Sequence, residues 1–163
     1  MELWQRRGIG ILSIGGGAIG VAAGLQLILS RSNPIEWIFC LAFIAIYAWG
    51  VWSGTKFLEG DDRALRPLLK YWALQVPTFG SPILGYLLAS GFNATVTYQF
   101  WPSRISGNMM LGSSFNYSLM QEGTPWSIGV NLFALVVTVW LYRVFGGLAP
   151  DNSPKQTAQS LCD

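Results

Sequence analysis

The sequence predicts an all-α integral membrane protein, a four-transmembrane-helix bundle with a β-hairpin outside the membrane. Three observations lead to this fold class. The 163-residue chain is 52% hydrophobic and only 11% charged, whereas soluble domains contain about a quarter charged residues. Its apolar residues form four long stretches, and its Lys and Arg residues lie at the ends of those stretches. At this length a single domain is expected.

The composition argues against several classes of function. A net charge of +2 is too small to indicate a nucleic-acid-binding surface. The chain has no histidine, the commonest general base and metal ligand. Its two cysteines, Cys40 in an apolar stretch and Cys162 near the C-terminus, are not expected to meet. We therefore expect no cofactor, no metal site, no disulfide framework and no enzymatic activity.

The first predicted transmembrane helix covers residues 8–29, an uncharged run of 22 residues that follows Arg6 and Arg7. A helix needs about 20 residues to cross a membrane. A signal peptide is the alternative, because basic residues also precede its apolar region, but that region is usually about 7–15 residues long. The length favours a helix that is retained in the mature protein.

Three glycines of this helix, Gly16, Gly20 and Gly24, are spaced four residues apart and share one face. Small residues at this spacing let two helix backbones approach closely. Glycine is also simply frequent in membrane helices, which is the alternative explanation. We interpret the three glycines as a helix-packing face, and we favour packing within the chain over a homodimer.

The second predicted helix covers residues 37–55, and the most charged part of the chain, residues 56–70, follows it. Glu59, Asp61 and Asp62 could be read as a cation site, but their spacing does not match a 12-residue calcium loop. A solvated turn in which an aspartate caps the next helix is the better explanation.

The third predicted helix covers residues 68–92 and is interrupted near its centre by Pro77, Gly80 and Pro82. Each proline removes a backbone donor and clashes with the preceding turn, so we expect this helix to be kinked or broken. Inside a bilayer the freed carbonyl groups need protein or water as partners. Both a plain kink and a ligand site are compatible with this break.

An antiparallel hairpin is predicted at about residues 94–120. Apolar and polar residues alternate over residues 95–100 and again over 109–119, and residues 102–108 between them are rich in turn formers. Such alternation predicts two paired strands. Because a lone hairpin is marginally stable in water, its apolar face should pack on helix ends, lipid or another subunit.

The last predicted helix covers residues 126–145, completing a membrane domain of residues 1–147 with a tail at 148–163. Eight of the ten Lys and Arg residues lie on the N-terminal side of the predicted membrane. The positive-inside rule then places both termini in the cytoplasm and the hairpin outside the cell membrane. Two glycosylation sequences, at Asn93 and Asn116, would matter only in a eukaryotic secretory membrane. The compact chain favours a bacterial origin.

Between their ends the predicted helices contain no Asp, Glu, Lys or Arg, which argues against a proton-coupled transporter. Several amide and hydroxyl side chains remain, and most of them fall in the external half of the membrane. We expect a candidate polar pocket for a neutral group, formed by Gln26, Gln75, Thr78, Ser81 and Asn131. The alternative is that each side chain makes one interhelical hydrogen bond.

Two functional hypotheses follow from these features. The first is a non-enzymatic association or accessory subunit, which contacts a homo-oligomer or another membrane protein through the hairpin and the glycine-rich first helix. The alternative is a protein that binds or passes a small molecule or lipid at the broken third helix, since broken helices form the sites of many transporters. A membrane enzyme using external carboxylates such as Glu36 and Glu122 is a distant third.

Overall fold

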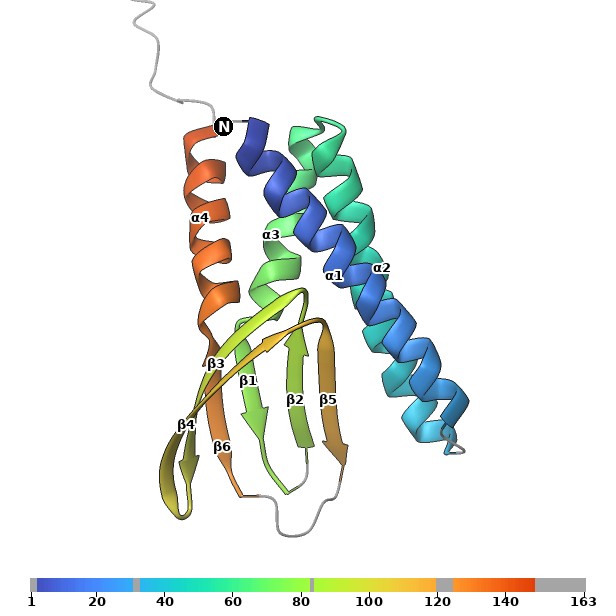
Figure 1. Cartoon of the computed structure of the whole chain (residues 1–163), viewed down its shortest axis with the longest axis vertical. Coiled ribbons are helices and arrows are strands. Elements are labelled where there is room, and N and C mark those ends of the chain that lie inside the picture. The colour runs from blue at the N-terminus through green and yellow to red at the C-terminus, as the bar shows by residue number, and fades with distance from the viewer. Residues whose placement is uncertain (1–2, 31–32, 83, 120–124, 149–163) are drawn as a thin grey trace, which may run out of the picture.

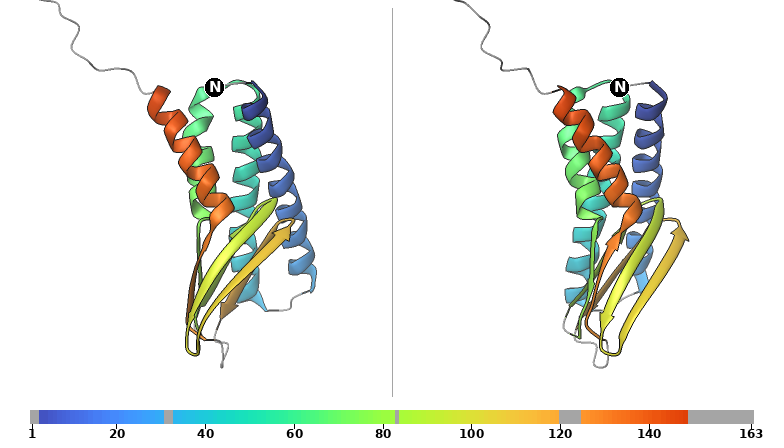
Figure 2. Two further views of the ribbon diagram at one scale, coloured as in Figure 1. Left: turned by 60° about the vertical axis from the view of Figure 1, so that its left-hand side comes forward. Right: turned by 90° about the vertical axis from the view of Figure 1, so that its left-hand side faces the viewer.

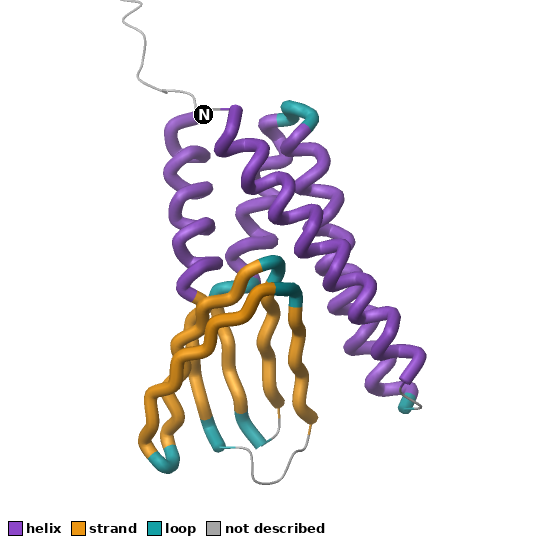
Figure 3. Tube along the Cα trace, viewed as in Figure 1, coloured by secondary structure: helices purple, strands orange, loops and turns teal. Residues whose placement is uncertain are grey.

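The computed structural model describes the whole chain except residues 1–2, 31–32, 83, 120–124 and 149–163. The two later helices lie at the end of the molecule opposite the strands, and the two long N-terminal helices run alongside both, as Figures 1 and 3 show. The helices are α1 (Leu3–Ser30), α2 (Pro34–Leu58), the short 3-10 helix η1 (Asp62–Ala64), α3 (Leu65–Leu74) and α4 (Leu132–Leu148). The prediction of an all-α bundle of four transmembrane helices is wrong, because an antiparallel sheet forms much of the chain.

The sheet contains six strands in the order β4-β3-β6-β1-β2-β5, and all neighbouring pairs are antiparallel. In chain order the strands are β1 (Pro77–Gly80), β2 (Leu84–Ala89), β3 (Phe92–Phe100), β4 (Ser103–Leu111), β5 (Ser114–Leu119) and β6 (Ser127–Asn131). The last strand in sequence, β6, therefore lies in the interior of the sheet between β1 and β3.

The first two helices are long and apolar enough to cross a membrane, and they are the only two described helices that meet this criterion. A core helix of a soluble protein can pass the same test, but it is mostly buried. Here only 28% of the apolar window of α1 and 22% of that of α2 is buried. A signal sequence passes the test as well, since both helices are near the N-terminus. The side chain of Asn33 caps α2 by accepting a hydrogen bond from the Ile35 amide, and Pro34 occupies the first turn.

The third helix differs most from its prediction. It ends at Leu74, and the predicted kink is instead a change from helix to strand, because Pro77 begins β1. Pro77 has no N–H, and the residue before a proline is disfavoured in helical conformation, so the helix cannot continue. Pro82 lies between β1 and β2. The predicted span at residues 68–92 therefore contains the end of α3, two strands and the start of a third.

The predicted pairing of the hairpin is wrong, although a hairpin forms in this region. Its strands are β3 and β4, with Phe100 opposite Ser103, so the turn-rich segment of residues 103–108 is strand. The predicted second strand, residues 109–119, is divided between β4 and β5, and β5 pairs with β2. Part of the predicted fourth span is also strand, because β6 precedes α4. The predicted tail lies outside the described residues from residue 149 onward.

Two joints turn the four strands β2 to β5 into one bent ribbon. β2 runs into β3 through Ser90 and Gly91, and β4 runs into β5 through Gly112 and Ser113. Gly91 and Gly112 have positive φ values of +80° and +120°, which favour glycine, and the Gly112 amide donates to the Gly91 carbonyl over 2.7 Å. One half of the ribbon pairs with β1 and the other with β6, so the sheet curls, as Figure 2 shows.

The helical end has a conventional apolar core. Trp72 is fully buried, and its indole N–H donates to the Ser13 hydroxyl over 3.0 Å. Around it are buried apolar side chains from α2, η1, α3 and α4: Phe57, Ala64, Leu65, Leu68, Tyr71, Ala134, Val137 and Leu141. This core holds α3 and α4 together above the sheet and fixes where the strands begin.

Candidate functional site: the polar inner face of the sheet

The inner face of the curled sheet is built from residues that face one another across three strands. Thr78 on β1 is opposite Gly129 on β6, which is opposite Thr97 on β3. A Cβ atom at Gly129 would lie 2.5 Å from Thr78 Oγ1 and 2.7 Å from Thr97 Oγ1. Both hydroxyls therefore lie over Gly129 on the same face of the sheet.

A second polar row lies two residues closer to the helices. Asn131 on β6 is opposite Thr95 on β3, and its backbone amide donates to the Val76 carbonyl over 2.9 Å. The Thr95 hydroxyl donates to Asn93 Oδ1. Thr78, Asn93, Thr95 and Asn131 are each at most 4% exposed. Together with Thr97 and Gly129, we call these residues the polar inner face.

The outer face of the same strands is apolar and exposed. Because side chains alternate along a strand, the residues between those of the inner face point outward. Exposed apolar residues on this outer face are Phe79, Val96, Tyr98, Phe100, Ile105, Met109, Leu111, Ile128 and Val130. A sheet in water normally buries its apolar face and exposes its polar one. Strands β1, β3 and β6 have the opposite arrangement, whereas Leu88 on β2 is buried against α2.

Three buried polar atoms in or beside the inner face have no hydrogen-bond partner within the described protein: Thr78 Oγ1, Asn131 Nδ2 and Gln75 Oε1. A buried polar group without a partner costs about 1–3 kcal/mol. Such atoms are therefore available to a hydroxyl- or amide-bearing ligand or to ordered water. Gln75 Oε1 can only accept a hydrogen bond, Asn131 Nδ2 can only donate one, and the Thr78 hydroxyl can do either.

The structure brings together part of the predicted polar pocket. Thr78 and Asn131 lie on neighbouring strands, and Gln75 and Ser81 are buried just beyond the two ends of β1. Gln75 Nε2 donates to the Tyr71 carbonyl over 3.3 Å. Gln26 is exposed on α1 and does not join them. Of the helix-break residues, Pro77 and Gly80 are the first and last residues of β1, and Pro82 follows it.

Sequence reasoning missed Asn93, Thr95 and Thr97 as site residues. Their signal was the alternation of polar and apolar residues along 93–99, which identified a strand. The alternation did not show which face is buried.

The three glycines of α1 each meet a neighbour within the chain. Gly16 lies against the ribbon joint, where a Cβ would lie 2.7 Å from the Gly91 amide nitrogen, and its carbonyl accepts a hydrogen bond from Ser113 Oγ. Gly20 lies against the ring of Tyr47 on α2, and a Cβ at Gly24 would lie 2.5 Å from Ile44. This face is thus occupied by α2 and the ribbon.

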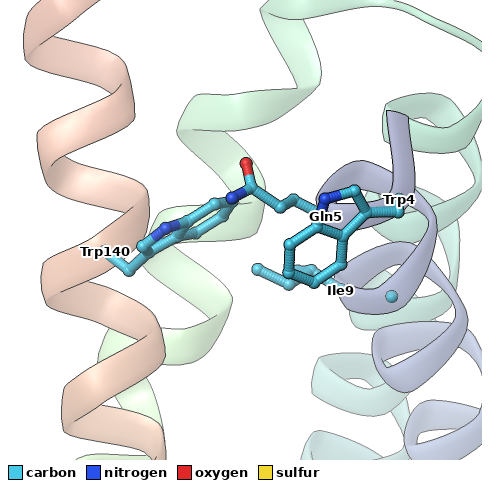
Figure 4. Close-up of a pocket in the computed structure, with 5 residues that line it drawn as sticks. Trp4, Gln5, Ile9 and Trp140 are labelled. Carbon is cyan, nitrogen blue, oxygen red and sulfur yellow. The ribbon is translucent and has the colours of Figure 1, made fainter. Parts of the chain in front are cut away.

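A hollow lies at the opposite end of the molecule, between α1 and α4. Its volume is about 210 Å³, and it is lined by Trp4, Gln5, Gly8, Ile9 and Trp140. Figure 4 shows the two indoles on either side, with the Gln5 side chain reaching toward Trp140. We call this hollow the terminal crevice.

No family model, curated protein or solved structure matches this chain. The chemistry of the site must therefore be judged from its own residues. Within the described ranges no group of three or more His, Cys, Asp or Glu residues is placed to hold a metal ion. The buried polar residues of the described chain are Ser, Thr, Asn and Gln, with no Asp, Glu, Lys or Arg among them. Such a site can donate and accept hydrogen bonds to a neutral group.

Proposed function

We propose that this protein is a non-enzymatic, multi-pass protein of the cell membrane that binds the neutral polar group of an amphiphile on the inner face of its sheet. Both termini are cytoplasmic in this proposal, and the sheet lies on the external side with its apolar outer face against the bilayer. The observation that carries the proposal is the reversed polarity of the sheet, with hydroxyls and amides inside and apolar side chains outside.

The exposed apolar surface supports the membrane placement. Large exposed apolar patches are rare on soluble monomers and mark membrane or protein contacts. Here the apolar outer face of the sheet adds to the exposed apolar faces of α1 and α2. The N-terminus of α1, the link from α2 to α3 and the end of α4 share one end of the molecule, and they carry most of the basic residues. A cytoplasmic position of this end agrees with the positive-inside rule.

The inner face supports a neutral, hydroxyl-rich ligand. Partnerless acceptors and a donor lie close to the curled strands, and the buried polar set of the described chain carries no charge. An ionised ligand would lose its hydration there without gaining a counter-charge. The hydroxyls of a sugar or glycerol headgroup offer both donors and acceptors.

The test is a comparison of two threonine-to-valine variants. Thr78→Val removes the partnerless hydroxyl of the inner face and keeps the side-chain shape. Thr138→Val removes a hydroxyl that is also buried and partnerless, but lies on α4. Each full-length protein is reconstituted with a monoglycosyl diacylglycerol, and the glycolipid that stays bound is measured by native mass spectrometry.

We expect the wild type and Thr138→Val to retain the glycolipid. Thr78→Val should retain about tenfold less bound glycolipid than the wild type. Thr78→Val should fold at least as stably as the wild type, because it removes a buried hydroxyl that has no partner. Equal retention by both variants, or none by the wild type, would contradict the proposed binding function.

A second candidate function, association with another membrane protein, is favoured by the open edge of β4. The Phe100 amide donates to the Trp126 carbonyl. The backbone N–H and C=O groups of even-numbered β3 residues are therefore directed toward β6, and those of odd-numbered residues toward β4. On β4 the even-numbered residues then bond to β3. The odd-numbered residues, including Gly107 at its centre, direct their backbone groups outward. Such an edge accepts an added strand from a partner.

This candidate is tested at Gly107, where no atom lies within 4 Å of an added Cβ. Gly107→Pro removes one outward N–H without touching the bonds to β3, whereas Gly107→Ala keeps it. A protein recovered from native membranes with the wild type and Gly107→Ala, but not with Gly107→Pro, supports strand addition. Recovery of the same proteins with all three rules it out.

A further inference from the structure

The terminal crevice has the lining of a site for a hydrocarbon chain. Trp4, Gln5, Gly8 and Ile9 form one stripe over two turns of α1, and Trp140 faces them from α4. Gln5 is the one polar side chain among these lining residues. No atom lies within 4 Å of a Cβ added at Gly8, so the missing side chain leaves this part of the crevice open.

The size of the crevice restricts its occupant. Its volume of about 210 Å³ is below the roughly 300–1,000 Å³ of pockets for drug-sized ligands. A helix of another protein, about 10 Å across, is also too wide to enter it. A flexible hydrocarbon chain is narrow enough. In a bilayer such chains surround the protein on all sides.

One basic residue flanks the crevice on the side of the chain termini. Arg143 follows Trp140 by one turn toward the end of α4 and is exposed. Arg7 is also exposed, but at 3.6 residues per turn it lies on a different side of α1 from the lining residues. The neighbouring Arg6 is engaged elsewhere, since its Nε donates to the Phe57 carbonyl and its guanidinium lies 3.7 Å from Asp62.

We infer that the terminal crevice binds one anionic phospholipid from the cytoplasmic leaflet. One acyl chain lies between the two tryptophans, and the phosphate lies at the level of Arg143. Tryptophan is enriched at this depth of a membrane, and basic residues there attract anionic lipids. This inference rests on the proposed membrane placement, but it concerns a different site and a charged rather than a neutral headgroup.

The experiment compares two glycine-to-leucine variants of α1. Gly8→Leu fills the crevice, and Gly15→Leu adds the same side chain at the other α1 glycine whose added Cβ meets no atom within 4 Å. Full-length proteins in detergent are mixed with phosphatidylglycerol or with phosphatidylcholine of the same acyl chains. Bound lipid is counted by native mass spectrometry.

We expect the wild type and Gly15→Leu to hold one phosphatidylglycerol, and Gly8→Leu to bind it at least tenfold more weakly. Arg143→Gln should bind the two lipids equally. Equal binding by Gly8→Leu and Gly15→Leu, or no preference of the wild type for phosphatidylglycerol, overturns the inference.

Two further readouts separate this failure from a failure of the proposed function. If the protein is released from membranes by alkaline carbonate, the membrane placement is wrong and both proposals fall. If it stays in the membrane and Thr78→Val still loses the glycolipid while Gly8→Leu binds phosphatidylglycerol normally, only the crevice site is wrong.

Discussion

The helical end and the sheet of this protein bury opposite kinds of side chain. At the helical end, tryptophan, leucine and tyrosine fill the interior around Trp72. In the sheet, threonine and asparagine lie inside while valine, isoleucine and methionine are exposed. The first region is organised as in any water-soluble core. The second exposes its apolar side chains, a contrast that the proposed membrane location would explain.

The largest effect is expected where the helical core is densest. Trp72→Ala removes a fully buried indole, its hydrogen bond to Ser13 and its edge-to-face contact with Phe133 at 5.9 Å. We expect a loss of about 3–5 kcal/mol in the free energy of unfolding, measured in detergent. Trp52→Ala, at a position 55% exposed on α2, is the control and should change little. Similar losses for both would mean that the apolar core is elsewhere.

The next largest effect tests the outer face of the sheet. Val96→Arg places a charge on a side chain that is 41% exposed. If this face contacts lipid, the substitution should destabilise the protein by about 2–4 kcal/mol in bilayers. On a water-exposed strand the same change stays within about 0.5 kcal/mol. Reversible unfolding in lipid vesicles measures the difference, with Val96→Leu as the control. A small effect of Val96→Arg would show that the outer face of the sheet does not contact lipid.

A smaller effect is expected where α1 meets α2, beside the sheet. An alanine Cβ at Gly20 collides with the ring of Tyr47, whereas one at Gly15 meets nothing. Gly20→Ala should destabilise the protein by about 1–3 kcal/mol through overpacking. Gly15→Ala should stabilise it by up to about 1 kcal/mol, because alanine is the better helix former. Thermal unfolding of both variants gives the comparison, and equal shifts would show that Tyr47 moves aside freely.

The smallest effect compares two helix caps in different surroundings. Asn131 Oδ1 is buried and accepts from the Ala134 amide over 3.3 Å and from the Ala94 amide over 3.4 Å. Asn33 caps α2 at an exposed site. We expect Asn131→Ala to lower stability by about 2 kcal/mol and Asn33→Ala by about 0.5 kcal/mol, since only the first leaves buried donors without a partner. Chemical denaturation in detergent tests the order, and the difference would disappear if water enters the inner face.

The two long helices could be predicted from the sequence because an uncharged apolar run of more than 20 residues has few other stable forms in a membrane. The predicted ranges, 8–29 and 37–55, fall within the observed α1 and α2. The strands β1 and β2 could not be predicted in the same way. Their leucine- and alanine-rich run at residues 83–89 has the composition of a membrane helix, and periodicity cannot separate a short apolar strand from a helix.

The site was only partly predictable for a related reason. Thr78 and Asn131 were chosen as polar residues within apolar runs, and the structure places them on adjacent strands. Gln26 was chosen by the same rule but faces outward, because the depth of a residue along a helix does not fix its direction around the helix. The pairing of Thr95 with Asn131 joins strands that are distant in the sequence, and no local pattern specifies it.

The position of β6 has a consequence for how the chain must be assembled. The sheet interior is closed by the last strand to leave the ribosome, which has to enter between β1 and β3 after both have been made. Until residue 131 has emerged, β1 and β3 each have an unpaired edge, and such edges are disfavoured in lipid. The sheet is therefore completed last, when β6 pairs with β1 and β3 and α4 follows it directly. A chain that stops before Ser127 would leave the ribbon paired with β1 alone and the edge of β3 open.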